Sequence, residues 1–597
     1  MIPVSISKTN IAEPLFSGKP SILGKKWYEK PADSRESLAI SQQFSLSPFI
    51  GKLLASRQLT AVTANNYLIP TLKQLMPDPS HLKDLDIGVN RVLEALINKQ
   101  KIAVFGDYDV DGATASALFK RYFQDIKQEI TIYIPQRLEE GYGPNIPALT
   151  QLKEEGHQLL IMVDCGTTAF DALAHARKIG LEVIIIDHHI SAPLLPEVTA
   201  LINPNRIDET SPLTTLCAAG LSFIFLVALH RALKMKGWFG SAQAEPDLRQ
   251  YLDLVALGTV CDVMPLTGLN RAFVTQGLKI LHRRSNLGLK ALADIASVDE
   301  APSAYHLGFM IGPRINAGGR VGKANYGTRL LSTRDPIEAQ HLARELDLYN
   351  KERQEIEMAV LEQATEEVLQ KNLHQKPLII VGGLNWHIGV IGIVAGRLKE
   401  RFNKPVCVVG FDNNIGKGSG RSVAGVNLGS AMHLACQKGL LAQGGGHAMA
   451  AGFTVMQDQY DNFYDFLCHH LAKDIANIEP RLDLDAILSP GAATIQFVTE
   501  LGHLEPYGNG NPTPKICLHR VKIVGIERVG VNHLRCFAYG EDGARVKVMA
   551  FRAHETEFGD QLLKLQGKLT SIAGTLKLDK WNGRQEVTFV LEDVMPH

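Results

Sequence analysis

The chain has 597 residues, which is too long for one ordinary domain and predicts roughly three to five domains. Lysine plus arginine and aspartate plus glutamate both total 62, so no global electrostatic field attracts an anionic partner. The eight cysteines form no C-x-x-C pair, so we expect neither structural zinc nor disulfides. No leader opens the chain, and no apolar run approaches the ~20 residues of a membrane span. We therefore expect a cytoplasmic protein without membrane contact.

The first half of the chain predicts an N-terminal polar extension over residues 1–50 and an α/β domain over residues 51–335. In that domain, short apolar runs alternate with stretches of helical spacing. The runs are KIAVFGD, ITIYIP, LLIMVDCG, VIIIDHH and ALINP. Continuous apolar strands that alternate with helices indicate a parallel sheet covered on both faces. Ligands of such sheets bind at the carboxyl ends of the strands.

The second half predicts three further parts. A charged, glycine-free segment predicts one long connecting helix over residues 336–372. A second, smaller α/β domain follows over residues 373–480, and residues 481–514 form a linker. Residues 515–597 carry about five short strands separated by turn residues, which predict an all-β, OB-like barrel suited to binding nucleic acid.

Acidic and histidine residues follow four apolar runs: Asp107, Asp109 and Asp111 in DYDVD, Asp164 in VDCGTT, Asp187, His188 and His189 in IDHHIS, and Asp262 in ALGTVCDVMPL. We expect all four groups at strand ends. Crowded carboxylates repel one another unless cations or protons offset their charge. Carboxylates and imidazoles are ligands for Mn²⁺ or Mg²⁺, and imidazole favours Mn²⁺. For any single aspartate the alternative is a helix N-cap, and we expect Asp187 to orient a neighbouring histidine.

Four of these motifs, VFGDYDVDGATASAL, VDCGTT, VIIIDHH and LGTVCDVMPL, resemble those of the DHH phosphoesterase family. Further motifs, YIPQRLEEGYG, GPRINAGGRVG, KGSGRS, GGGHAMAAGF and EPYGNGNPTP, are similar to those of its bacterial single-strand-specific exonucleases, from about residue 25 to the end. The resemblance implies a parallel-sheet DHH domain, a DHH-associated domain and an OB-like domain. It also implies two divalent ions, Mn²⁺ or Mg²⁺, with Mn²⁺ favoured. The implied metal ligands are Asp109, Asp111, Asp164, His188 and Asp262, with Asp164 as the bridge between ions.

The resemblance gives Asp107 and His189 further catalytic positions, His189 as an acid or as a group that orients the scissile phosphate. Residues expected to bind DNA or phosphate are Arg137, Arg314, Asn316, Arg320, Ser419, Arg421 and His447. Arginine beside glycine allows bidentate phosphate contacts and close backbone approach. By resemblance, Ser419 and Arg421 join Arg137 around the 5′-terminal phosphate. His447 follows three glycines at an expected helix start, which suits a phosphate, although a tight turn would also need glycine.

The implied function is a single-stranded-DNA-specific exonuclease that degrades 5′→3′ to 5′-mononucleotides by two-metal-ion hydrolysis in recombination and repair. The implied partners are single-stranded DNA with a 5′ end, a single-stranded-DNA-binding protein and a helicase, and the implied state is a monomer. One alternative is a DHH-family oligoribonuclease, cyclic-dinucleotide phosphodiesterase or polyphosphatase, against which the chain after residue 515 counts. The other is a non-catalytic DNA-binding scaffold, against which the complete set of carboxylates counts.

Overall fold

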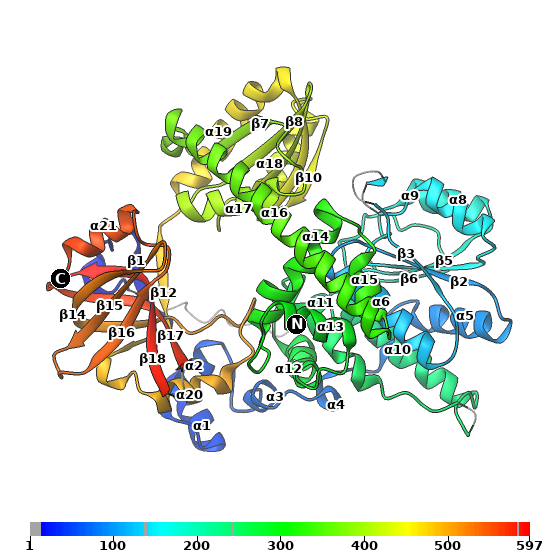
Figure 1. The fold of residues 1–597 in the computed structure, drawn as a ribbon, viewed down its shortest axis with the longest axis horizontal. Helices are drawn as coiled ribbons and strands as arrows, with labels where there is room; N and C mark the ends of the chain where they lie inside the picture. The colour runs from blue at the N-terminus through cyan, green and yellow to red at the C-terminus, as the bar shows by residue number, and fades with distance from the viewer. Residues whose placement is uncertain (1–12, 137–139, 142, 242, 582–583) are drawn as a thin grey trace, which may run out of the picture. The chain divides into compact units, whose positions relative to one another are not determined.

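The computed structural model describes residues 13–136, 140–141, 143–241, 243–581 and 584–597 (Figure 1). The chain divides into two compact units. One comprises Met1–Met76, Pro265–Ala272 and Glu479–His597, and the other comprises Pro77–Met264 and Phe273–Ile478. The second unit contains most residues of both predicted α/β domains, but residues 51–76 and 265–272 of the first predicted domain belong to the other unit.

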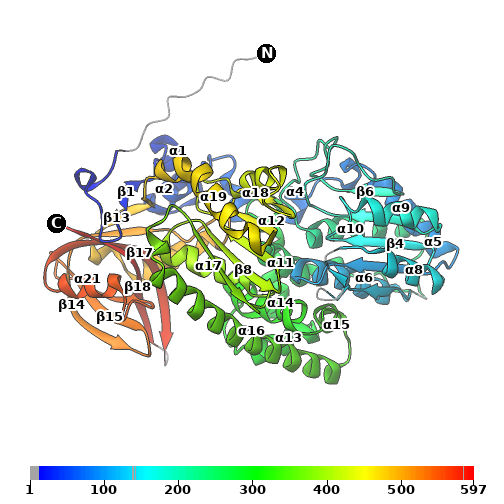
Figure 2. The ribbon, with the colours of Figure 1, turned by 90° about the horizontal axis from the view of Figure 1, so that it is seen from above.

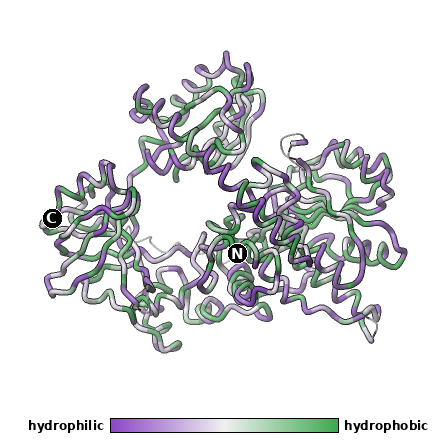
Figure 3. The backbone as a smooth tube through the Cα atoms, viewed as in Figure 1, coloured by the Kyte–Doolittle hydropathy of each residue, from purple (hydrophilic) through white to green (hydrophobic). Residues whose placement is uncertain are grey.

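The first α/β domain is built on a five-stranded parallel sheet in the order β3-β2-β4-β5-β6, which confirms the predicted parallel sheet. Its strands are β2 (Ile102–Gly106), β3 (Thr131–Tyr133), β4 (Leu159–Val163), β5 (Glu182–Ile186) and β6 (Ala200–Ile202). Most of their residues are buried, and the strands are mainly green in Figure 3. Because helices cover both faces of the sheet, the strands are mainly apolar and do not alternate between apolar and polar residues.

One face of this sheet packs on α8 (Ile146–Glu154) and α9 (Phe170–Lys178). The other face contacts α5 (Leu85–Ile97), α6 (Val110–Asp125) and α10 (Ala218–Met235). By length and composition alone α10 could cross a membrane, with a mean hydropathy of 1.4. However, 67% of that window is buried within the protein, so its apolar character is that of a core helix.

Helices complete the domain: α11 (Leu252–Cys261), α12 (Gly268–His282), α13 (Leu287–Ile295), α14 (Gly312–Val321) and α15 (Tyr326–Ser332). The predicted long helix forms as α16 (Pro336–Gln370), and Figure 2 shows it as one continuous helix. Its start is capped by the Asp335 side chain, which accepts a hydrogen bond from the Ile337 amide, with proline at the first helical position.

The second α/β domain has a five-stranded mixed sheet in the order β10-β11-β9-β8-β7. Its strands are β7 (Ile379–Leu384), β8 (Val406–Asp412), β9 (Ile415–Arg421), β10 (Gln443–His447) and β11 (Ala450–Met456), with helices α17 (Ile391–Phe402), α18 (Leu428–Gln437) and α19 (Tyr460–Ala476). The helix start expected after the three glycines is wrong. QGGGH is the edge strand β10, which forms an antiparallel hairpin with β11.

The unit that holds the C-terminus contains the predicted barrel. Its strands are β13 (Ala486–Leu488), β14 (Ile516–Val529), β15 (His533–Gly540), β16 (Arg545–Ala550), β17 (Leu569–Trp581) and β18 (Arg584–Pro596), and the β14–β17 pairing closes the sheet. The N-terminal extension and the predicted linker both carry structure. Strand β1 (Lys26–Glu29) pairs in parallel with β12 (Arg481–Leu484), so residues far apart in sequence complete this unit.

Candidate active site

The loop after β2 and the first turn of α6 hold the DYDVD aspartates. Asp109 is the N-cap of α6, and its Oδ1 accepts hydrogen bonds from the amides of Asp111 (2.9 Å) and Gly112 (3.1 Å). The Asp111 carboxylate in turn accepts hydrogen bonds from the Ala218 amide (2.6 Å) and the Ala219 amide (2.9 Å), at the start of α10. The capping role that sequence reasoning offered as the alternative is therefore real, and both side chains also face the acidic cluster.

Three other elements bring the remaining members together. Asp164 follows β4 and has a left-handed backbone conformation (φ 62°), and His188 follows β5. The strand end expected for Asp262 is wrong, because Asp262 is the C-cap of helix α11. Val263, directly after it, also has a left-handed conformation (φ 58°), which is strained for a β-branched residue.

His188 lies at the centre of the cluster. Its Nε2 lies 3.2 Å from Asp164 Oδ1, 3.5 Å from Asp262 Oδ2 and 3.8 Å from Asp111 Oδ2. Among the described residues, ligand atoms within 4.8 Å of one another form three groups. Two of them are Asp107 with Asp109 and Asp164, and Asp111 with His188 and Asp262; the third joins Asp187 and His189 to Asp164 and His188. Asp107, which the sequence analysis assigned to catalysis, thus lies within one ligand group.

The electrostatics of this cluster fit divalent cations. Burial and the neighbouring carboxylates raise the pKa of Asp164 well above its usual value. The same two causes raise the pKa of Asp262 to about 9, and burial raises the pKa of Asp111 although His188 opposes the shift. Asp262 Oδ2 is also buried without a hydrogen bond from any described residue. Carboxylates that repel one another in a buried cluster are stabilised when a cation joins them.

Asp187 holds His189, as the sequence analysis expected of a positioning residue. Its Oδ1 lies 2.7 Å from His189 Nδ1 and accepts hydrogen bonds from the amides of His188 (2.8 Å) and His189 (3.2 Å). Although burial opposes it, the hydrogen bond to His189 and the charge of that ring keep the pKa of Asp187 below its usual range. The same hydrogen bond raises the pKa of His189. His189 is therefore fixed in orientation and favoured in its protonated form.

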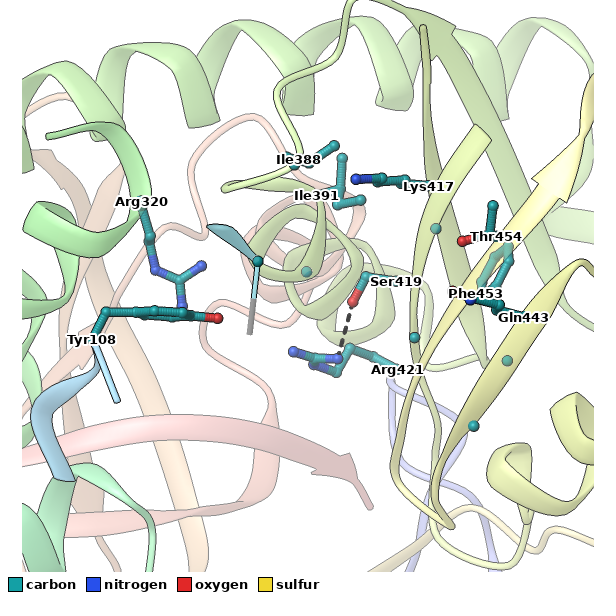
Figure 4. A pocket seen from close by; sticks show the side chains of 16 residues that line it. Tyr108, Arg320, Ile388, Ile391, Lys417, Ser419, Arg421, Gln443, Phe453 and Thr454 are labelled. Atoms are coloured by element: carbon teal, nitrogen blue, oxygen red, sulfur yellow. Dashed lines mark hydrogen bonds between the residues drawn. The ribbon is translucent and has the colours of Figure 1, made fainter. Parts of the chain in front are cut away.

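A pocket of about 520 Å³ joins the loop of the DYDVD motif to the second α/β domain (Figure 4). Tyr108 and Arg320 line one side, and Ser419 and Arg421 line the sheet opposite. Arg421 Nη1 donates hydrogen bonds to Ser419 Oγ (3.2 Å) and to the Gly420 carbonyl (2.9 Å).

Helix α17 contributes Gly392 to this pocket. A Cβ at that position would lie 3.0 Å from Ser419 Oγ and 3.2 Å from Arg421 Nη2, so glycine leaves room for both side chains. Sequence reasoning missed Gly392 and Tyr108. Glycine within an apolar helix carries no specific signal, whereas the position of Tyr108 between two aspartates offered one.

The other predicted residues differ in position. Asn316 Oδ1 accepts a hydrogen bond from the Val110 amide (3.2 Å), next to the acidic cluster. Arg314 Nε instead pairs with Asp347 of α16 (2.9 Å), and Arg320 Nη1 donates to the Gly389 carbonyl (2.6 Å).

His447 is exposed at the end of β10 and is not among the residues that line the pocket. Arg137 lies outside the described residues. The structure therefore brings Arg320, Ser419 and Arg421 to one pocket, but neither Arg314 nor His447 lines it.

Comparison with known families finds three matches along the chain. Residues 101–259 match the DHH family, N-terminal domain, residues 374–473 match the DHHA1 domain, and residues 484–593 match the RecJ OB domain. These follow the order of the domains described above.

Individual proteins give the same result. The single-stranded-DNA-specific exonuclease RecJ of Salmonella typhimurium is 33% identical over 567 residues, covering 92% of this chain and 96% of its own. RecJ of Bacillus subtilis is 32% identical over 576 residues, covering 95% and 70%. The crystal structure of RecJ in complex with Mn²⁺ from Thermus thermophilus matches with a TM-score of 0.79 and 30% identity, covering 96% of this chain and 79% of that chain. The chain belongs to the RecJ family of single-stranded-DNA-specific exonucleases.

Proposed function

We propose that this protein digests single-stranded DNA from its 5′ end and releases 5′-mononucleotides. One observation carries the direction: Tyr108, between two aspartates of the acidic cluster, lines the same pocket as Ser419 and Arg421. A strand whose terminal phosphate binds Ser419 and Arg421 would therefore extend toward the carboxylates. The first internucleotide phosphate would then be the one that is cleaved.

We assign two of the ligand groups to two divalent ions, Mn²⁺ or Mg²⁺. Asp107, Asp109 and Asp164 would hold one ion, and Asp111, His188 and Asp262 the other, with Asp164 positioned to serve both. Oxygen ligands suit both metals, and the imidazole of His188 favours Mn²⁺. When bound, two such ions activate the attacking water and stabilise the leaving oxygen.

The surrounding side chains would orient the substrate and move a proton. Asp187 fixes the His189 ring and favours its protonated form, so His189 is suited to donate a proton to the leaving oxygen. Arg421 has no carboxylate partner among the described residues, which leaves its charge for a phosphate. Tyr108 presents a ring beside the path that we assign to the terminal nucleotide.

We further propose that the protein works as a cytoplasmic monomer in DNA recombination and repair. A nuclease restricted to single strands needs DNA that has been unwound and kept open. A helicase and a single-stranded-DNA-binding protein are therefore the partners that we expect. Stimulation of duplex digestion by adding both proteins, beyond the effect of either alone, would support this part of the proposal.

A digestion assay tests the main proposal. The substrates are one single strand labelled at its 5′ end, the same strand labelled at its 3′ end, a blunt duplex and a short RNA, each with Mn²⁺, Mg²⁺ or EDTA. We expect immediate release of labelled mononucleotide from the 5′-labelled strand, stepwise shortening of the 3′-labelled strand, and an intact duplex. Cleavage of the short RNA alone would favour the oligoribonuclease alternative, and binding without cleavage would favour the scaffold.

Asp164→Asn is the variant that should be folded but inactive in this assay. Asparagine has the same shape and tolerates the left-handed conformation of residue 164, so the fold is retained while a ligand charge is removed. Asp109→Ala would be a poorer choice, because Asp109 also caps α6 and its loss would cost about 1 kcal/mol of stability. We expect Asp164→Asn to lower the rate by on the order of 10³-fold.

A further inference from the structure

The pocket continues past Ser419 and Arg421. Three strands of the second sheet place Lys417 (β9), Thr454 (β11) and Gln443 (β10) directly opposite one another, Lys417 paired with Thr454 and Thr454 with Gln443. All three line the pocket. In Figure 4, Gln443 and Thr454 lie on the far side of Ser419 and Arg421 from Tyr108 and Arg320, and Lys417 lies above Ser419. This row is called the outer row below.

The outer row and Ser419 share one face of the sheet. Residues 417, 419 and 421 alternate along β9, so their side chains point to the same side, and residues two apart are separated by roughly 7 Å. The row that contains Ser419 continues through Gly452 and Gly445. A Cβ at either glycine would meet nothing within 4 Å, so this part of the pocket floor is open.

The charged side chains described along the pocket are all positive. Among the described residues, its lining includes three cations, Arg320, Lys417 and Arg421, and no carboxylate. Lys417 is exposed and forms no salt bridge with any described residue. In a chain whose net charge is zero, such a concentration of cations attracts an anion locally. Because the terminal phosphate is assigned to Ser419 and Arg421, a group attached to that phosphate would lie near Lys417, which is two residues from Ser419 on the same face.

We propose that the outer row is a subsite for a second phosphate at the 5′ end of the strand, so that ends carrying a 5′-diphosphate are bound more tightly than 5′-monophosphate ends. The ammonium of Lys417 would contact the additional phosphate, and the Thr454 hydroxyl and Gln443 amide would donate hydrogen bonds to it. The open floor over Gly452 and Gly445 provides the space. This inference rests on the proposed function, because that function places the terminal phosphate.

Equilibrium binding tests the subsite without relying on catalysis. A 3′-fluorescein oligothymidylate with a 5′-hydroxyl, 5′-monophosphate or 5′-diphosphate end is titrated with the full-length protein in EDTA, and anisotropy gives Kd. We expect the diphosphate end to bind about tenfold more tightly than the monophosphate end, as for one added charged hydrogen bond. Lys417→Met should remove that gain, Arg421→Met should reduce the gain from hydroxyl to monophosphate, and Lys473→Met, exposed on α19, should change neither.

Two results would overturn the proposal. One is equal binding of monophosphate and diphosphate ends by the unmodified protein. The other is a Lys417→Met variant that weakens both ends by the same factor, because Lys417 would then contact the strand itself. Digestion of the same oligonucleotides with Mn²⁺ is measured separately, so a failure of the nuclease function leaves the binding result interpretable.

Discussion

The acidic cluster and the pocket beside it are opposite in composition. The cluster gathers buried carboxylates around His188, whereas the residues that the structure describes along the pocket include three cations and no carboxylate. The difference is also one of rigidity, because Asp109 and Asp111 are fixed by helix starts while Lys417 is a long exposed side chain. Each region is opposite in charge to its proposed ligand, a cation for the cluster and a phosphate for the pocket. Substitutions in the two regions should therefore change different properties of the protein.

Beside the loss of activity expected of Asp164→Asn, the largest effect on the choice of DNA end should come from Arg421→Met. A hydrogen bond to a charged group contributes roughly 1.5–3 kcal/mol, so on the proposed assignment the preference for a 5′-phosphate over a 5′-hydroxyl end should fall by roughly 10–150-fold. Digestion rates of both ends, measured at substrate concentrations below KM, provide the test. Arg401→Met, at the exposed end of α17, is the control. An unchanged preference would remove Arg421 from the pocket that we assign to the 5′ end.

Asp187→Asn should lower activity by roughly 10–100-fold, the range for partners that orient ligands from outside the metal site. The amide can no longer favour a protonated His189, so its pKa should fall and the alkaline limb of the kcat profile, where a proton donor is lost, should move to lower pH. A pH–rate profile of the variant beside the unmodified protein measures the shift. A uniform loss at every pH would instead indicate that Asp187 only supports the loop, through the amides that it binds.

Without metal, the acidic cluster should make stability depend on pH. The pKa of Asp262 is raised to about 9 in the folded protein, above the value near 4 of an unfolded chain. The folded state therefore binds more protons in that window, and the contribution of Asp262 to stability is lost as the pH rises through it. Asparagine does not ionise, so Asp262→Asn should escape this loss; in EDTA its Tm should exceed that of the unmodified protein at pH 8.5 and approach it at pH 5.

Adding Mn²⁺ should reverse the order of stability at pH 8.5, because ions bind the ionised carboxylates. Thermal unfolding of both proteins with EDTA or Mn²⁺ checks both statements. Equal Tm values for the two proteins in EDTA at both pH values would contradict the assigned repulsion.

The smallest effects should come from glycines of the β10–β11 hairpin. Gly446 has φ +144° and a Cβ there would lie 2.4 Å from the Ala450 carbonyl, so Gly446→Ala should cost about 1 kcal/mol or more. Gly452→Ala should leave the free energy of unfolding within about 0.5 kcal/mol, because a Cβ there meets nothing. Urea unfolding separates the two. Weaker binding of diphosphate ends by Gly452→Ala would mark its glycine as needed for the ligand.

The sequence predicts the parts of this molecule that depend on local pattern. The continuous apolar runs indicate the parallel sheet, and the charged segment after Pro336 indicates α16. Asp262 was placed at a strand end because a buried helix and a buried strand can both read as a continuous apolar run. The glycines before His447 carry no strand signal, since glycine is disfavoured in strands, although β10 pairs with β11 in a local hairpin.

The candidate site shows the same limit. Arg314 and Arg320 stand in one motif, but Asp347 on a later helix pairs with Arg314 while Arg320 lines the pocket. No local pattern distinguishes Arg314 from Arg320, because Asp347, the partner of Arg314, is 33 residues away in the sequence. The acidic cluster was easier to anticipate, since four groups of like ligands at the ends of buried elements converge when the elements pack together.

The double role of Asp109 and Asp111 bears on how this fold can change in evolution. Each carboxylate belongs to the acidic cluster and also receives the first amides of a helix, Asp109 for α6 and Asp111 for α10. A descendant that lost the chemistry would still have to begin both helices. Serine or asparagine at position 109 would preserve the cap, whereas alanine would not. Drift toward a non-catalytic DNA-binding relative should therefore leave small polar residues at these positions, as a trace of the former ligands.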